Sequence, residues 1–141
     1  MRIFNLLFCF VIATTTIGCG GENYGLAPVS GTVFFNGKPL SNATVIFAPE
    51  VNDIRVAIGT TNNEGKYQLT SFRIYDGARI GKHIVTIRAF EDLGGPFIPR
   101  DDNQRVQGKM VTPISYANPE TSNLFAEVEK KNNIINFQLA E

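Results

Sequence analysis

Apolar and polar residues alternate along most of this chain from Val29 onward, and short clusters of turn-forming residues interrupt the alternation. Residues 29–35 show the pattern, and Asn36-Gly37 follows with two residues that accept the positive φ angles of a tight hairpin turn. Successive side chains of a β-strand point to opposite faces, so such a segment has one apolar face. The alternation therefore predicts short strands rather than helices.

The same pattern predicts about seven strands, separated by turns every 8–12 residues or so. They cover residues 29–35, 44–48, 55–61, 66–70, 82–90, 124–128 and 134–139. The longest, 82–90, is expected to be central, and in the last one Ile135, Phe137 and Leu139 are expected to face inward. This arrangement is typical of an all-β, antiparallel sandwich of two sheets.

The N-terminal segment predicts export and lipid attachment. Residues 1–18 combine Arg2 with a short apolar run, as in a secretory signal, and are too short and too polar for a permanent membrane span. Gly18 before Cys19 resembles the lipobox of bacterial lipoproteins, although Thr16 stands where leucine is usual. We therefore expect acylation at Cys19, a tether over 19–27 and a domain over 28–141; a plain signal peptide with an incidental Cys19 is the alternative.

The cysteine content and the charge of the chain argue against disulfides and against nucleic acid as a partner. Cys9 and Cys19 are the two cysteines of the sequence, so cleavage and acylation would leave a domain without disulfides. The chain has 13 basic and 13 acidic side chains and no basic stripe that would neutralise phosphates, which argues against nucleic acid. The predicted location is the bacterial cell envelope, with the lipid in the membrane and the domain facing the periplasm or the exterior.

One long segment, residues 91–112, lacks the alternation of short strands and turns seen in the rest of the domain. Connections of this length in a compact domain are usually functional or disordered. Its acidic residues Glu91, Asp92, Asp101 and Asp102 could collect a calcium ion, but their spacing matches no calcium loop. The favoured interpretation is a solvated loop that protects a sheet edge, and no metal site is predicted.

Five segments together resemble the carboxypeptidase regulatory-like domain family. They are residues 29–40, 43–47, 60–69, 81–87 and 113–124. The first three read as G-x-V with a G-K-P-L turn, an A-x-V strand, and a T-x-x-x-G-x-Y-x-L hairpin. The last resembles a segment of small bacterial lipoproteins that contain this domain. The resemblance implies a transthyretin-like (prealbumin-like) sandwich that serves as an accessory, carrier or adhesive module.

Two positions depart from the family pattern. His83 stands where an aromatic residue is usual, and Ser115 stands where the lipoprotein group has lysine. His83 is the one histidine of the sequence, and it shares strand parity with Val85 and Ile87, so it is expected to fill or border the core. No Gly-x-Ser-x-Gly elbow and no histidine cluster is present. The sequence therefore predicts neither an enzyme nor a cofactor.

Two functions remain open. The first is a structural or protein-interaction module that docks an envelope protein through exposed sheet faces such as those of Phe34, Ile46 and Phe125. The second is a carbohydrate- or peptide-binding lipoprotein. For the second, aromatic and basic residues predicted on loops are the candidate ligand contacts: Tyr75, Phe97, Arg100 and Tyr116.

Overall fold

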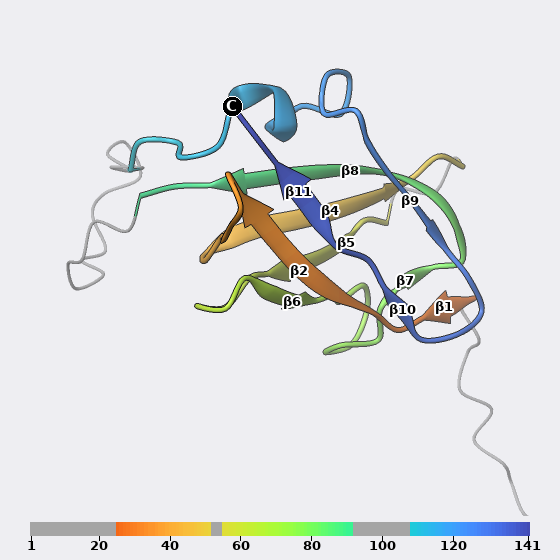
Figure 1. Cartoon of the computed structure of the whole chain (residues 1–141). Helices are drawn as coiled ribbons and strands as arrows, with labels where there is room; N and C mark the ends of the chain where they lie inside the picture. Colours follow the sequence, from red (N-terminus) through yellow and green to blue (C-terminus); the bar gives the residue numbers. More distant parts are fainter. Residues whose placement is uncertain (1–24, 52–54, 92–107) are drawn as a thin grey trace, which may run out of the picture.

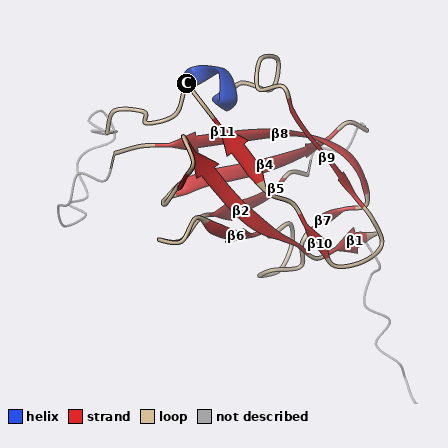
Figure 2. Cartoon of the chain, in the orientation of Figure 1, coloured by secondary structure: helices blue, strands red, loops and turns tan. Residues whose placement is uncertain are grey.

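In the computed structural model, strands of two β-sheets enclose one apolar core (Figure 1). The structure describes residues 25–51, 55–91 and 108–141. Within these ranges the regular structure is almost all β, with one short 3-10 helix, η1 (Ile114–Ala117) (Figure 2). The predicted all-β class is confirmed.

The first sheet is antiparallel throughout. Its order is β5 (Ala57–Thr60), β4 (Ala43–Pro49), β8 (Gly81–Ala89) and β9 (Leu124–Val128). The nine residues of β8 lie between β4 and β9, so the longest strand is an inner strand, as expected.

The second sheet is built around β2 (Val29–Phe35). On one side, β3 (Lys38–Pro39) and β6 (Lys66–Gln68) pair with it in antiparallel fashion. On the other side, β10 (Asn133–Ile134) and β11 (Phe137–Leu139) pair with it in parallel. Asn36 and Gly37, with φ of 48° and 77°, make the predicted hairpin turn between β2 and β3.

The terminal strand differs from the prediction in two ways. The sequence predicts one continuous strand in an antiparallel sandwich, whereas the structure has two short strands parallel to β2. The direction follows from where the strand starts: the N–H of Asn133 donates to the carbonyl oxygen of Pro28, immediately before β2 begins. Both strands therefore leave the same end of the sandwich and run the same way.

A further short pairing lies before β2. Strand β1 (Leu26–Ala27) pairs with β7 (Ala78–Arg79) in antiparallel fashion. The predicted tether extends to residue 27, so β1 and the hydrogen bond from the Ile80 N–H to the Gly25 carbonyl place its last three residues in the folded domain. Two residues are too few to show an alternation of period two, which is why the sequence pattern missed this strand.

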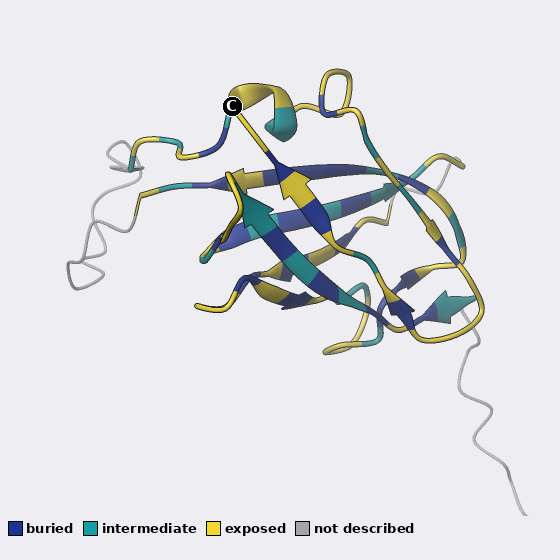
Figure 3. Cartoon of the chain, viewed as in Figure 1, coloured by how far each residue is buried: buried dark blue, intermediate teal, exposed yellow. Residues whose placement is uncertain are grey.

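The core consists of side chains that point inward from both sheets. Figure 3 shows the buried positions in dark blue on strands of both sheets. In β4 the inward residues Ala43, Val45 and Phe47 are fully buried. The Phe47 ring meets the Phe137 ring edge-on at 6.0 Å between centroids, which joins the two sheets. The last segment behaves as predicted, because Phe137 and Leu139 are buried and Ile135 packs partly buried against the core, while Asn136 and Gln138 are exposed.

Between β10 and β11 the terminal chain runs beside β2, and its backbone closely approaches that of β2 at Gly31. A Cβ atom at this position would overlap the carbonyl oxygen of Ile135, so only glycine allows the approach. The same carbonyl accepts a hydrogen bond of 2.7 Å from the buried Tyr67 hydroxyl, and burial raises the pKa of this phenol. Next along the chain, Asn136 Oδ1 accepts a hydrogen bond of 2.8 Å from the N–H of Thr32. These two side-chain hydrogen bonds thus hold the terminal chain in place where its strand is interrupted between β10 and β11.

We predict that Gly31→Ala lowers the free energy of unfolding by about 3 kcal/mol or more, because a backbone segment must move to accept the methyl group. Urea denaturation measures this change. Ser30→Ala, one residue earlier in the same strand, is the matched control and is expected to cost less than about 1 kcal/mol. Equal losses for the two variants would show that the close approach is not required.

Candidate functional site

The outer surface of the first sheet carries a row of apolar side chains, which we call the apolar face: Ile46, Ile58, Ile84 and Phe125. Ile46 lies opposite Ile58, and Ile84 lies opposite Phe125, so two cross-strand pairs span all four strands. Ile58 is 44 % exposed and Phe125 is 64 % exposed.

Charged residues border the apolar face at both ends. Arg88 follows on β8 at one end, and Lys82 and Glu127 lie opposite each other at the other end. Apolar surface with a polar border is typical of a protein-interaction site. Phe34, which the sequence groups with Ile46 and Phe125, lies on β2 in the other sheet and is not part of this face.

The outer surface of the second sheet is hollowed between β2 and β6. This hollow, of about 550 Å³, is lined by hydroxyl, amide and aromatic side chains that include Ser30, Thr32, Gln68 and Tyr75. A second hollow of about 300 Å³ shares Ser30, Gln68 and Tyr75 with it and continues towards residues 132–134. Hydrogen-bonding groups beside an aromatic ring are what a polar ligand such as a carbohydrate or a peptide needs.

Tyr75 is the predicted ligand contact that lines the hollow. Its side chain is 63 % exposed, and its backbone has φ of 61°, a conformation that is uncommon for residues other than glycine. Its N–H donates to Thr70 Oγ1 at 3.0 Å, which helps to hold this conformation.

The structure does not bring the other predicted contacts to Tyr75. Tyr116 lies on η1, where its hydroxyl donates to the carbonyl oxygen of Ala140 at 3.2 Å and accepts from the Ala140 N–H at 3.3 Å. Tyr116 thereby ties the segment beside β8 to the end of β11 and closes one side of the sandwich. Phe97 and Arg100 lie outside the described residues, as does Cys19.

His83 fills the core, as expected from its strand parity. It is 1 % exposed, its ring centroid lies 5.7 Å from that of Phe47, and its Nδ1 lies 3.0 Å from the carbonyl oxygen of Gly81. Burial lowers the pKa of the imidazole below its ordinary value, although the Gly81 carbonyl and the Glu50 carboxylate favour the charged form. A neutral, enclosed imidazole is a packing residue rather than an exposed base.

Acidic residues do not converge in the described part of the chain. Within residues 25–51, 55–91 and 108–141, no group of three or more His, Cys, Asp or Glu side chains could hold a metal ion. Of the acids considered for calcium, Glu91 is described, whereas Asp92, Asp101 and Asp102 lie outside the described residues.

The two sheets packed around one apolar core define the protein as a β-sandwich. Comparisons with models of known families and with curated proteins found no match.

Among the described residues, no helix has the length and apolar character needed to cross a membrane.

Sequence reasoning found parts of both surfaces but not their extent. Ile46 and Phe125 were identified, but their neighbours Ile58 and Ile84 were not, because strand order decides which outward residues meet. The hollow was missed for the same reason, since Ser30 and Gln68 become neighbours only through the pairing of β2 with β6. The outward-facing positions of each alternating strand are the part of the sequence pattern that could have identified these residues as surface candidates.

We predict that stability falls as the pH drops from 7 to 5 and that His83→Phe flattens this dependence. The unfolded chain takes up a proton near pH 6.5, above the lowered pKa of folded His83, so acidification favours unfolding. The slope from one such group is at most about 1.4 kcal/mol per pH unit. Thermal unfolding across this pH range measures the effect, and an unchanged slope in the variant would assign it to other groups.

Proposed function

We propose that this chain is a non-catalytic, lipid-anchored module of the bacterial cell envelope that binds another envelope protein. The observation that carries the binding role is the apolar face, where two cross-strand pairs place Ile58 and Phe125 in solvent. A sheet surface of this kind loses unfavourable contact with water when a partner covers it.

The lipid anchor is supported by the sequence around Cys19. An apolar leader and a small residue precede this cysteine, and Gly20-Gly21 follow it. Cys9 lies within the leader, so Cys19 is the one cysteine that the mature chain would retain. Acylation would consume its thiol and leave the domain free of reactive cysteines.

We also propose a carboxypeptidase regulatory-like, transthyretin-like identity for the sandwich. Strands β2, β4, β6 and β8 coincide with the segments that carry the sequence resemblance. The hairpin turn at Asn36-Gly37 also lies where that pattern has its G-K-P-L turn. These correspondences favour an accessory or interaction role over catalysis.

Replacing Cys19 with serine in the full chain is expected to release the protein from membranes without unfolding the sandwich. The reason is that the acyl chains, at about 0.8 kcal/mol per buried methylene, supply the anchoring energy. Membrane sedimentation, together with the mass of the mature chain, measures the change. A Cys19→Ser protein that still sediments and resists high salt would contradict the anchor.

Phe125→Glu is expected to reduce cross-linking to a discrete envelope partner in intact cells by about 10-fold or more, because the variant removes the one aromatic side chain of the apolar face and places a charge in its position. Ile114→Glu is the matched control, since Ile114 is 76 % exposed on η1 and lies outside the apolar face. The control is expected to cross-link as the wild type does.

The hollow supports a second candidate, an envelope protein that binds a carbohydrate or a peptide. Its hydroxyl and amide groups lie beside Tyr75, whose ring could stack on a sugar. If Phe125→Glu leaves cross-linking unchanged while the protein binds a glycan saturably and Tyr75→Ala abolishes that binding, the hollow is the functional site and the apolar face is not.

A further inference from the structure

Four segments meet at the end of the sandwich where the described chain begins. The N–H of Ile80 donates to the carbonyl oxygen of Gly25 at 2.8 Å. Gly77, with φ of 91°, packs so closely on Ala27 that a Cβ atom would overlap the Ala27 carbonyl. We call this end the β1 end; it consists of β1, β7, the loop of residues 70–77 and the turn of residues 129–133 (Figure 1).

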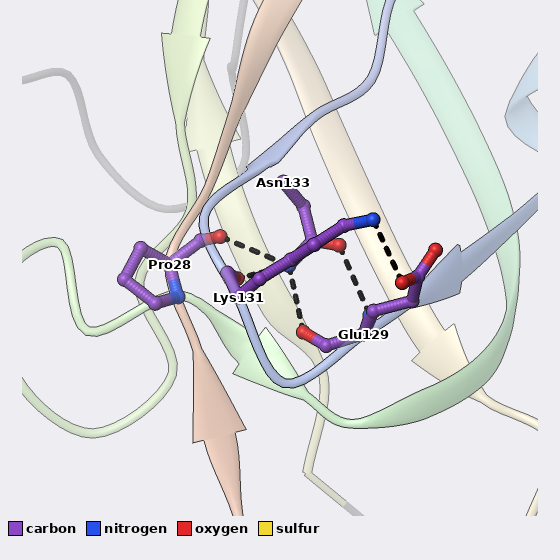
Figure 4. A network of polar contacts seen from close by, with 4 residues as sticks. All are labelled: Pro28, Glu129, Lys131 and Asn133. Carbon is purple, nitrogen blue, oxygen red and sulfur yellow. Dashed lines mark hydrogen bonds and ion pairs between the residues drawn. The ribbon is translucent and has the colours of Figure 1, made fainter.

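Asn133 fixes the turn of residues 129–133 (Figure 4). Its Oδ1 accepts a hydrogen bond of 3.0 Å from the N–H of Glu129, and its Nδ2 lies 3.3, 3.0 and 2.7 Å from the carbonyl oxygens of Pro28, Glu129 and Lys131. Lys131 Nζ pairs with Glu129 Oε2 at 2.7 Å. The neighbouring Lys130 is exposed, so the turn presents a net positive charge on a fixed backbone.

Asp76 fixes the loop of residues 70–77. Its carboxylate accepts hydrogen bonds of 2.7, 2.9 and 2.8 Å from the N–H groups of Ser71, Phe72 and Arg73. Burial alone would raise the pKa of this carboxyl, but these hydrogen bonds outweigh it and hold the pKa below its ordinary value. The tip of the loop is therefore held in one shape at neutral pH.

Exposed apolar side chains are concentrated on this end. Ile74 at the loop tip is 81 % exposed, and Val51, Phe72 and Ile80 are 62 %, 36 % and 37 % exposed. Arg73 and Arg79 lie among them, and the Arg55 guanidinium stacks 4.2 Å from the centre of the Phe72 ring. Apolar side chains interspersed with basic ones match the boundary between acyl chains and anionic headgroups.

The proposed anchor lies close to this end. Because Gly25 is already tied to Ile80, the chain from Cys19 to Gly25 spans at most about 20 Å even when fully extended. That is shorter than the strand length of the sandwich, since the nine residues of β8 extend about 30 Å. The acylated cysteine would therefore hold the β1 end, and not the opposite end, next to the bilayer.

We infer that the β1 end rests on the membrane that holds the anchor, with Ile74 inserted at the headgroup boundary and the cations of loop 70–77 and of turn 129–133 on anionic lipid. This docking surface rests on the proposed acylation of Cys19. It is distinct from the apolar face, and it fixes the orientation of the domain on the membrane, which a single lipid attachment point would not do.

The test uses tryptophan as a depth probe, because the sequence contains no tryptophan. Full-length acylated protein with Ile74→Trp is reconstituted in vesicles of phosphatidylethanolamine and phosphatidylglycerol, with or without bromine on the acyl chains. Ile114→Trp is the matched control, since Ile114 is 76 % exposed on η1, beside the end of β11. Melting curves show that each variant is folded.

We expect the emission of the probe at position 74 to shift to the blue and to lose most of its intensity on brominated vesicles, while the probe at position 114 changes little. Vesicle-bound protein with no quenching at position 74 would overturn the docking surface and leave the anchor standing. A blue shift without quenching would also overturn it, because a second copy of the chain would then cover the loop. Protein that does not float with the vesicles would overturn both the anchor and the docking surface.

Charge reversal tests the basic half of the surface. Lys130→Glu in the Ile74→Trp protein is expected to weaken the quenching, because the turn then repels phosphatidylglycerol. Lys38→Glu, in the exposed β2–β3 hairpin at the opposite end, is the control and is expected to leave it unchanged. Equal effects of the two reversals would show that no specific contact of the turn with anionic lipid exists.

Discussion

The close approach of the Ile135 carbonyl to Gly31 is the constraint on which the second sheet depends. It lets the terminal chain run in close contact with β2, and the Tyr67 hydroxyl donates a hydrogen bond to that carbonyl inside the protein. A buried carbonyl without a partner would be costly, so glycine, tyrosine and the interrupted strand belong together. Phe137, two residues after this close approach, packs against Phe47 in the core.

Much of the fold could be predicted because alternation reports directly which side of a strand is buried. In β4 the buried residues are those that the pattern assigns inward, and Asn36-Gly37 forms the turn that its composition demands. The parallel direction of β11 could not be predicted, since it depends on which strand the terminal chain joins and at which end. Here Asn133 meets Pro28, a residue far away in the sequence, at the start of β2. Alternation carries no information about which strands become neighbours.

The candidate surfaces, like the strand pairing, could be predicted only in part from the sequence. Tyr75 and Phe125 were identifiable as exposed aromatics, but their surroundings come from strand order and from loop shape. The loop that carries Tyr75 and Ile74 owes its shape to Asp76, whose carboxylate gathers three N–H groups. An aspartate before glycine predicts a turn, yet nothing local says that the turn presents an apolar tip beside basic residues.

The two proposals constrain each other through the direction of the strands. β4, β8 and β9 all run between the β1 end and the opposite end. A domain that rests on its β1 end therefore holds these strands steeply inclined to the membrane surface rather than parallel to it. The apolar face is then exposed on the side of the domain, at a height of at most about 30 Å above the lipid. A partner that covers Phe125 must therefore lie close to the same membrane. Docking of the β1 end would fix the orientation in which such a partner meets the face, and so lower the entropy lost on binding.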